Sequence, residues 1–236
     1  MKTILIATRN AHKVGEIRAI LGGAFEFHTL NDFPGAPQVV EDASTFAGNA
    51  TKKAVELARW LMAKHPTSNI QHPTPNFVLA DDSGLEVDAL DGAPGVHSAR
   101  FAALARSADG SSARSTGNSP DADNNARLLQ LLREVPAEKR TARFRCVIAL
   151  TPVPEGGPVS ASPVCSADEF EARTFDGACE GRMLLAPRGK NGFGYDPLFV
   201  PVGFDQTFAE LGEDVKNKLS HRAQALEKLK VFFLAK

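Results

Sequence analysis

The sequence predicts a fold of the α/β or α+β class built on a mixed β-sheet, and two observations lead to this prediction. Strand and helix patterns alternate at the beginning of the chain, as in a parallel β-α-β unit with a right-handed crossover. Later strand patterns follow one another closely, as in paired strands. The 236 residues are enough for one large domain, so we expect a single domain over residues 1–236.

Hydrophobic periodicity predicts the opening β-α-β unit. Residues 3–7 (TILIA) form an apolar run typical of a buried strand, and residues 25–30 (FEFHTL) form the next strand pattern. Between them, apolar side chains recur at helical spacing, and Gly22 gives a stop signal. The apolar positions of this helix are Val14, Ile17, Ile20 and Leu21.

The next segments predict a second helix followed by a strand. Apolar side chains have helical spacing from about 45 to 65, and the polar, proline-containing residues 65–76 predict a loop. Residues 77–80 (FVLA) have a strand pattern that we expect to end there. Residues 85–90 (LEVDAL) give a further short extended pattern.

The second half of the chain alternates between predicted loops and regular elements. Residues 105–122 and 152–164 are rich in small polar residues or prolines, which predicts surface loops. The regular elements that we expect are a helix at 123–134, a strand at 140–150, a strand-turn-strand at 170–184 and a long helix at 214–236.

Composition argues against several classes of protein. The formal net charge of −1 disfavours a protein that coats nucleic acid, because that function needs a basic face. No apolar run approaches the roughly 18 residues of a membrane-spanning helix, and the N-terminus lacks the apolar core of a signal peptide. The three cysteines form no CxxC pair, so we expect small buried residues in a reducing, cytoplasmic compartment. Neither nucleic acid nor a membrane is therefore an expected partner.

Residues 8–13 (TRNAHK) lie where the first predicted strand meets the first helix. Unpaired N–H groups and the positive end of the helix dipole make such a place suitable for phosphate. Asn10 would add a donor and Lys13 a positive charge. The alternative, which this stretch alone favours, is that Asn10 caps the helix and Lys13 is solvated. Neither standard glycine-rich phosphate loop is present.

Acidic residues occur at two further places. Asp81 and Asp82 repel each other unless cations or hydrogen-bond donors lie nearby, and alternation along a strand would point them in opposite directions. One of them could ligate Mg²⁺, which prefers hard oxygen ligands, whereas the alternative is a hydrated turn. Glu41 precedes the second helix, which carries Lys52 and Lys53, and is either another ligand or a carboxylate that complements the helix dipole.

Two late segments carry candidates for recognising a nucleotide base. In residues 186–199 (APRGKNGFGYDPLF), glycines flank Phe193, which could lie flat against a base, and Asp196 adds an acceptor. Residues 216–226 (KNKLSHRAQAL) carry the donors Lys216, His221 and Arg222. The alternatives are a glycine-rich hairpin with a core aromatic and a charged, solvated helix face.

Taken together and in order, these segments resemble the inosine triphosphate pyrophosphatase family, also called the dITP/XTP pyrophosphatases. The resemblance covers nearly the whole chain. Its segments are ATRNAHKVGEI, EDASTFAGNATKKA, LADDSGLEVDAL, PGVHSARFA, FRCVIAL, EGRMLLAPRGKNGFGYDPLF and KNKLSHRAQAL. This many ordered matches make the resemblance specific, although the first motif alone would not.

The resemblance implies an α/β fold with an elongated mixed β-sheet flanked by helices, and two lobes with a central substrate cleft. It also implies Mg²⁺-dependent hydrolysis of ITP, dITP and XTP to the monophosphate and pyrophosphate, which removes deaminated purines from the nucleotide pool. A nucleoside triphosphate is thus the expected small-molecule partner, and a cytoplasmic homodimer is the expected assembly.

The family's functional residues carry over to matching positions of this chain. The implied metal ligands are Glu41 and Asp82, Asp82 is also the implied general base, and Lys53 and Asp81 support catalysis. The implied substrate-binding residues are Thr8, Arg9, Asn10, Ala11, His12, Lys13, Ser83, Phe193, Gly194, Tyr195, Asp196, Lys216, His221 and Arg222.

Some features depart from the family pattern. His97 stands where relatives commonly have a tyrosine, and we expect it to pack rather than to bind a ligand. The loops at 105–122 and 152–164 are longer than the family suggests, but they interrupt no motif.

Three other functions deserve comparison. A Maf-type nucleotide pyrophosphatase is disfavoured by the SHR and GFGYDP segments. A nucleotide sensor without turnover is disfavoured by the intact acids and lysines. A nucleic-acid-binding module that uses the C-terminal helix is disfavoured by the near-neutral charge.

Overall fold

The computed structural model describes residues 1–64, 74–108, 117–154 and 170–235, and these residues form an α/β fold with a six-stranded mixed sheet. The predicted α/β class is confirmed. The strand order is β2-β1-β3-β4-β5-β6. The strands are β1 (Lys2–Ile6), β2 (Phe25–Thr29), β3 (Phe77–Val87), β4 (Thr141–Pro152), β5 (Arg173–Met183) and β6 (Phe199–Pro201). β1 pairs in parallel with β2 and β3, whereas β5 and β6 are antiparallel.

The chain divides into two compact units. The first unit consists of Met1–Asp82, Val147–Asp176 and Ala225–Lys236, and the second consists of Ser83–Cys146 and Gly177–Gln224. The division falls within β3, so the consecutive residues Asp82 and Ser83 belong to different units. The single domain expected over residues 1–236 stays a prediction.

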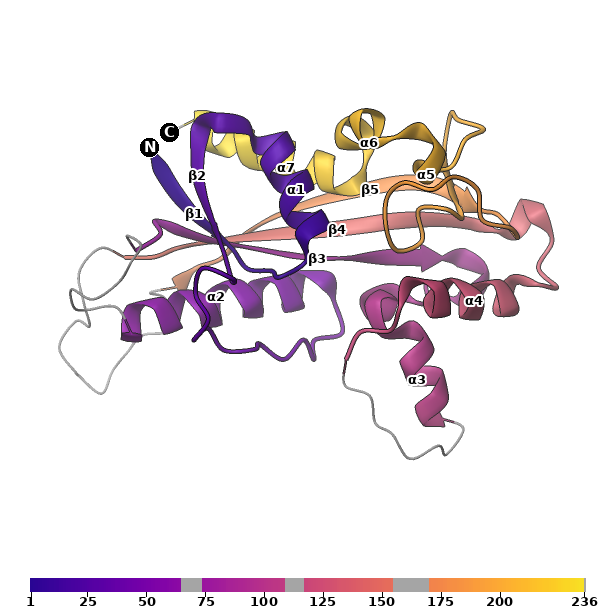
Figure 1. Ribbon diagram of the computed structural model, residues 1–236, viewed down its shortest axis with the longest axis horizontal. Coiled ribbons are helices and arrows are strands. Elements are labelled where there is room, and N and C mark those ends of the chain that lie inside the picture. Colours follow the sequence, from indigo (N-terminus) through magenta and orange to yellow (C-terminus); the bar gives the residue numbers. More distant parts are fainter. Residues whose placement is uncertain (65–73, 109–116, 155–169, 236) are drawn as a thin grey trace. The chain divides into compact units, whose positions relative to one another are not determined.

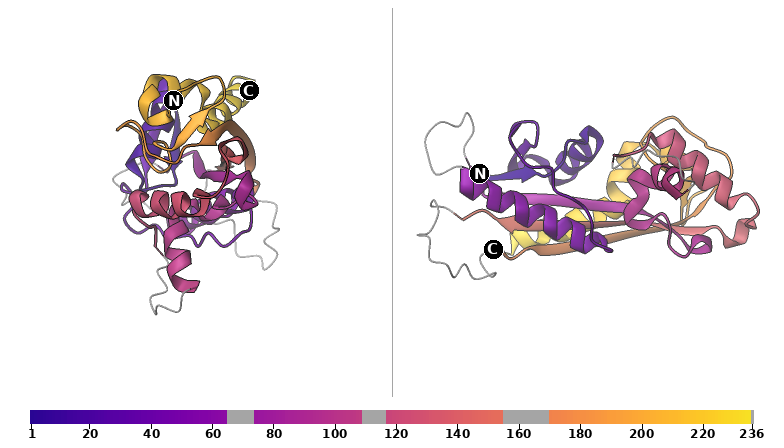
Figure 2. Two further views of the ribbon diagram at one scale, coloured as in Figure 1. Left: turned by 90° about the vertical axis from the view of Figure 1, so that its right-hand side faces the viewer. Right: turned by 90° about the horizontal axis from the view of Figure 1, so that it is seen from below.

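In the first unit, helices cover both faces of the sheet. α1 (Ala11–Leu21) and α7 (His221–Leu234) lie on one face, and α2 (Phe46–Lys64) lies along the other (Figure 1, and seen from below in Figure 2). Strands buried on both faces read as continuous apolar runs rather than alternating ones. This explains the TILIA pattern, because Ile4, Leu5 and Ile6 are all buried.

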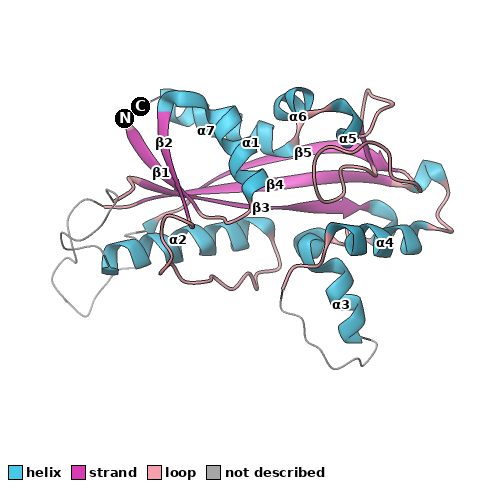
Figure 3. Ribbon diagram, in the orientation of Figure 1, coloured by secondary structure: helices cyan, strands magenta, loops and turns pink. Residues whose placement is uncertain are grey.

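The order β2-β1-β3 creates a point where the winding of the sheet reverses. The connection through α1 leads from β1 to one neighbour, and the connection through α2 leads from β2 back to the other (Figure 3). Ligands of open α/β sheets bind beyond the carboxyl ends of the strands at such a point. Ile6 at the end of β1 is level with Leu79 of β3, so the segment that follows β1 begins beside the part of β3 that carries Asp81.

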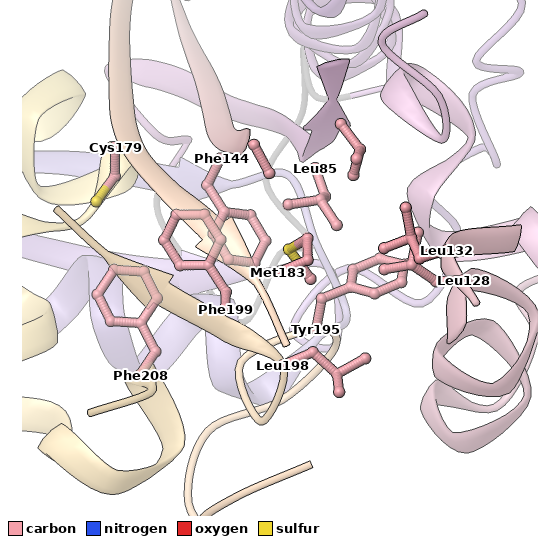
Figure 4. Close-up of a cluster of buried hydrophobic side chains, with 12 residues drawn as sticks. Leu85, Leu128, Leu132, Phe144, Cys179, Met183, Tyr195, Leu198, Phe199 and Phe208 are labelled. Atoms are coloured by element: carbon pink, nitrogen blue, oxygen red, sulfur yellow. The ribbon is translucent and has the colours of Figure 1, made fainter. Parts of the chain in front are cut away.

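The second unit has its own hydrophobic core (Figure 4). Phe144, Phe199 and Phe208 pack together, with the ring centroids of Phe144 and Phe199 4.7 Å apart. Tyr195 and Leu198, which belong to the loop that connects β5 to β6, extend this core. The helices of the unit are α3 (Phe101–Ala108), α4 (Asp121–Leu132), α5 (Phe208–Leu211), α6 (Glu213–Leu219) and the first turn of α7.

Three predicted boundaries are wrong. β3 does not end at the acids but continues through Asp81 and Asp82 to Val87. The strand-turn-strand at 170–184 is one strand, β5, whose Gly181 allows close approach of β6, since a Cβ there would lie 2.4 Å from the Val200 carbonyl oxygen. The long helix at 214–236 breaks at Ser220, which has extended backbone angles and accepts a hydrogen bond from the Ala223 N–H, as an N-cap does.

The predicted loops fall largely outside the described residues. Residues 105–108 of the first loop are helical, because α3 reaches Ala108, and residues 109–116 and 155–169 lie outside the description. The predicted burial of cysteine is confirmed for Cys146 and Cys179, while Cys165 is not described. Within the described ranges, no helix combines the length and apolarity needed to cross a bilayer.

Candidate active site

Asp81 and Asp82 lie in the middle of β3 and are both nearly buried, with exposures of 3% and 6%. Because side chains alternate along a strand, the two carboxylates point to opposite faces of the sheet, and each contacts a different helix. Asp81 forms an ion pair with Lys13 of α1, and Asp82 accepts a 3.0 Å hydrogen bond from Asn49 of α2. The hydrated turn considered for these acids is therefore wrong.

Lys53 of α2 connects the acids to Glu41. Its Nζ donates to the Asp81 backbone oxygen at 3.0 Å and lies 2.5 Å from Glu41 Oε1. Burial raises the pKa of the Asp82 carboxyl to about 6, against the lowering effects of Lys53 and Lys13 and with a smaller raising effect of Glu41. The Glu41 charge is thus among the causes that raise the Asp82 pKa, as expected for two carboxylates that could share one cation.

Asn49 was not assigned a role from the sequence. It is fully buried, its Oδ1 accepts from the Ala43 N–H at 2.9 Å, and its Nδ2 donates to Asp82 Oδ2. One amide thus ties the loop that carries Glu41 to the carboxylate of Asp82. The available signal was a polar residue on the apolar face of a predicted helix, because buried polar groups need defined partners.

The TRNAHK segment forms a capped helix start. Asn10 Oδ1 accepts from the N–H groups of His12 and Lys13, and Thr8 Oγ1 accepts from the Asn10 N–H. The capping alternative is therefore correct for Asn10. The solvated alternative is wrong for Lys13, because its ammonium group binds Asp81. Arg9, Ala11 and His12 are exposed beside it.

In the second unit, the predicted donors at the C-terminal helices are buried rather than solvated. Lys216, His221 and Arg222 have exposures of 4%, 4% and 1%. Lys216 Nζ lies 2.6 Å from Asp196 Oδ2, and Arg222 Nη2 donates to Ser83 Oγ at 2.9 Å. The His221 ring stacks on Phe144 with 4.9 Å between centroids. Buried cations need such partners, so the alternative of a charged, solvated face is wrong.

The loop at Phe193–Asp196 is folded around the Asp196 carboxylate. Asp196 Oδ2 accepts from the Phe193 N–H at 2.9 Å in addition to Lys216, whose Nζ lies 4.4 Å from the Phe193 ring centroid. Gly192 has φ +76°, and a Cβ there would lie 2.2 Å from Asp196 Oδ2. A glycine is therefore required at this position. The alternative of a glycine-rich hairpin with a core aromatic is correct in one respect, since Tyr195 is a core aromatic that donates to the Ser98 oxygen at 2.9 Å.

A family model described as the Ham1 family matches residues 4–232. The chain belongs to the Ham1 family. Among its relatives, a dITP/XTP pyrophosphatase of Desulforamulus reducens is 42% identical over 226 residues, which cover 95% of this chain and 92% of that protein. A dITP/XTP pyrophosphatase of Geobacter sulfurreducens is 45% identical over 231 residues, which cover 98% and 96%. The family predicted from the ordered segments is confirmed.

A solved Ham1-family structure has the same fold. The HAM1 protein from Coxiella burnetii superimposes with a TM-score of 0.73 at 34% identity, and the match covers 100% of both chains. The family model and this structure thus support the family and the fold over nearly the whole chain.

The predicted residues of this Ham1-family chain fall into two contact groups. The polyphosphate group, as we name it, lies in the first unit and contains Lys13, Glu41, Lys53, Asp81 and Asp82, with Thr8–His12 flanking it. The base group lies in the second unit and contains Ser83, Phe193, Asp196, Lys216 and Arg222, with Gly194, Tyr195 and His221 beside them. Their individual roles stay predictions.

The polyphosphate group suits a divalent cation by its donor chemistry. Glu41 and Asp82 offer carboxylate oxygens, which Mg²⁺ prefers, and burial raises the pKa of Asp82 in spite of Lys53 and Lys13, so a bound cation would favour its anion. Among the described residues, no cluster of three or more His, Cys, Asp or Glu side chains is arranged as a metal site. With Glu41 and Asp82 as its protein ligands, a cation here would take its other ligands from water and a polyphosphate, as Mg²⁺ commonly does.

Proposed function

We propose that this chain hydrolyses dITP, XTP and ITP to the monophosphate and pyrophosphate. Relatives named dITP/XTP pyrophosphatases support dITP and XTP as substrates. The observation that carries the proposal is the polyphosphate group, in which Lys13 pairs with Asp81 and Lys53 contacts both Glu41 and the Asp81 backbone next to buried Asp82. The group combines cationic side chains for phosphate oxygens with a protein carboxylate for a water molecule. A sensor without turnover would not need a carboxylate that activates water.

The lysines and the start of α1 bind the polyphosphate in this proposal. Lys13 and Lys53 supply positive charge where the transition state gathers negative charge. Mg²⁺ held by Glu41 and Asp82 would neutralise the polyphosphate and stabilise the leaving pyrophosphate. Asp82 orients a water molecule and accepts its proton as it attacks phosphorus. Asn49 supports this step by fixing Asp82 Oδ2 at 3.0 Å.

The base group selects the purine by matching donors to acceptors. Hypoxanthine and xanthine present a 6-oxo acceptor and an N1–H donor. His221 and Arg222 donate to the oxygen, and Asp196 accepts from N1–H. Adenine has the reverse pattern, and each unmatched buried group costs about 1–3 kcal/mol. Guanine shares the accepted pattern, so its exclusion depends on the 2-amino group.

Phe193→Ala should raise KM for every nucleotide by about tenfold, because stacking is not base-specific and contributes about 1–3 kcal/mol. The value of kcat should change less, since the polyphosphate group is untouched. Steady-state kinetics with dITP, XTP and dGTP measures this. A rise in KM that is confined to one of the three bases would contradict the stacking role.

A panel of triphosphates tests the reaction and the metal together. Pyrophosphate release should be fast with ITP, dITP and XTP, slow with the normal nucleotides, and lost when EDTA removes Mg²⁺. Restoration by added Mg²⁺ controls for damage to the protein. Equal rates with dATP and dITP, or release of single phosphates, would contradict the proposed function.

We propose further that the protein is a cytoplasmic homodimer, which the resemblance to the family implies. Light scattering on the purified protein would measure a mass of twice 25.2 kDa for a dimer.

A further inference from the structure

Two side chains of α4 hold the peptide backbone of Gly194 at both of its polar groups. Asp121 Oδ2 accepts from the Gly194 N–H at 2.6 Å, and Asn125 Nδ2 donates to the Gly194 oxygen at 3.0 Å. The two residues are four positions apart, so they lie one above the other on the same face of the helix. Neither was singled out from the sequence.

The helix that carries them is firmly placed within the second unit. Leu128 and Leu132 of α4 are fully buried in the core of that unit (Figure 4). Asn124 is also buried, and its Oδ1 accepts from the Ala102 N–H at 2.9 Å. α4 is therefore a rigid support, and contacts from it restrict whatever they bind.

The backbone conformation of Gly194 sets the relative orientation of the Phe193 and Asp196 side chains. It has φ +62°, a conformation in which the chain reverses direction, and it separates Phe193 from Asp196 by a tight turn. Rotation of the Gly194 peptide would move the Phe193 ring relative to the Asp196 carboxylate. The contacts from α4 oppose this rotation from both ends of the residue.

We infer that Asp121 and Asn125 are positioning residues that fix the Phe193–Asp196 loop in the conformation that binds the base. The inference rests on the proposed function, because it assigns the loop to the purine of the substrate. Neither residue touches the reacting phosphates in this scheme. Their loss should therefore weaken base binding while leaving polyphosphate binding intact.

Isosteric exchanges at the two positions should have opposite outcomes. Asp121→Asn keeps an oxygen that accepts from the Gly194 N–H, so kcat/KM for dITP should stay within about threefold of the wild type. Asn125→Asp replaces the donor by an oxygen that repels the Gly194 carbonyl, and Asn125→Ala removes the donor without adding charge. Both Asn125 variants should lower kcat/KM for dITP by about tenfold, mainly through KM, as expected for one lost hydrogen bond.

Product inhibition separates positioning from damage to the fold. In Asn125→Ala, the inhibition constant of dIMP should rise by about tenfold, while that of pyrophosphate should stay within about twofold. Gln130→Ala is the matched control, because Gln130 is an exposed residue of the same helix that hydrogen-bonds Arg127 and not the loop. This control should leave both inhibition constants unchanged.

Each failure has its own signature. An unchanged inhibition constant for dIMP in Asn125→Ala, or an equal rise for dIMP and pyrophosphate, would overturn the positioning role. Failure of the wild type to hydrolyse dITP would count against the proposed function instead. The wild-type assay and the comparison of variants therefore distinguish the two.

Discussion

Asp82→Asn should lower kcat for dITP by about a thousandfold or more, because the amide cannot accept the proton of the attacking water. It should also weaken the response to Mg²⁺, since one anionic ligand is lost. The measurement is pyrophosphate release at saturating dITP over a range of Mg²⁺ concentrations. Turnover above about a tenth of the wild-type rate would remove Asp82 from the proposed mechanism.

The same variant should stabilise the metal-free protein at neutral pH. Burial raises the pKa of Asp82 from 3.8 to about 6, so ionising this carboxyl opposes folding. Above pH 6 the full penalty is present, and it disappears as the pH falls toward 4, where the carboxyl is protonated in both states. At about 1.4 kcal/mol for each pKa unit, the penalty is about 3 kcal/mol.

Urea unfolding in EDTA checks this stability effect. The Asp82→Asn variant should exceed the wild type in free energy of unfolding at pH 7.5, and the difference should shrink toward pH 4.5. Asp42→Asn is the matched control, because Asp42 is an exposed acid paired with Lys52 and should show little gain at either pH. A gain for Asp82→Asn that is independent of pH would contradict the assigned cause.

Asp196→Ala should lower the free energy of unfolding by about 3–5 kcal/mol, because it leaves the buried Lys216 ammonium without its carboxylate. It also removes the acceptor of the Phe193 N–H. The double variant Asp196→Ala with Lys216→Met should be more stable than Asp196→Ala alone, since the uncompensated charge is gone. Chemical denaturation of the wild type, the single variants Asp196→Ala and Lys216→Met, and the double variant gives the coupling energy.

An exposed ion pair provides the control for this cycle. Lys228 and Asp176 lie 3.0 Å apart with more than half of each side chain exposed, so Asp176→Ala should cost less than about 1 kcal/mol. A double variant less stable than Asp196→Ala alone would show that Lys216 contributes through its other contacts rather than through the buried pair.

Local patterns predicted the parts of the fold that depend on local forces. The β1-α1-β2 unit follows from apolar periodicity, and the cap at Asn10 follows from its place before a helix. The acids at Asp81 and Asp82 were found as candidates because two adjacent charges after an apolar run need partners. Their strand was predicted too short, since those partners come from α1 and α2, which a local pattern does not bring together.

The residues that the sequence did not reveal are those defined by distant contacts. Asn49 and Asn125 are amides in helices, and their roles follow from their partners at Asp82 and Gly194. The burial of Arg222 depends likewise on Ser83, which is 139 positions away in the sequence. Family resemblance pointed to Arg222 without this contact, whereas local reasoning alone favoured a solvated face.

The contact between Lys53 and Glu41 gives the polyphosphate group an internal counter-ion. Without a divalent ion, the lysine already neutralises part of the acidic cluster, so the apoprotein does not depend on metal to hold these segments together. A divalent ion that binds Glu41 must displace the Lys53 ammonium, which stays close by because it belongs to the same chain. At the proposed magnesium site, metal uptake would then be an exchange of cations, with an occupancy that follows the supply of magnesium and substrate rather than one that persists after each reaction cycle.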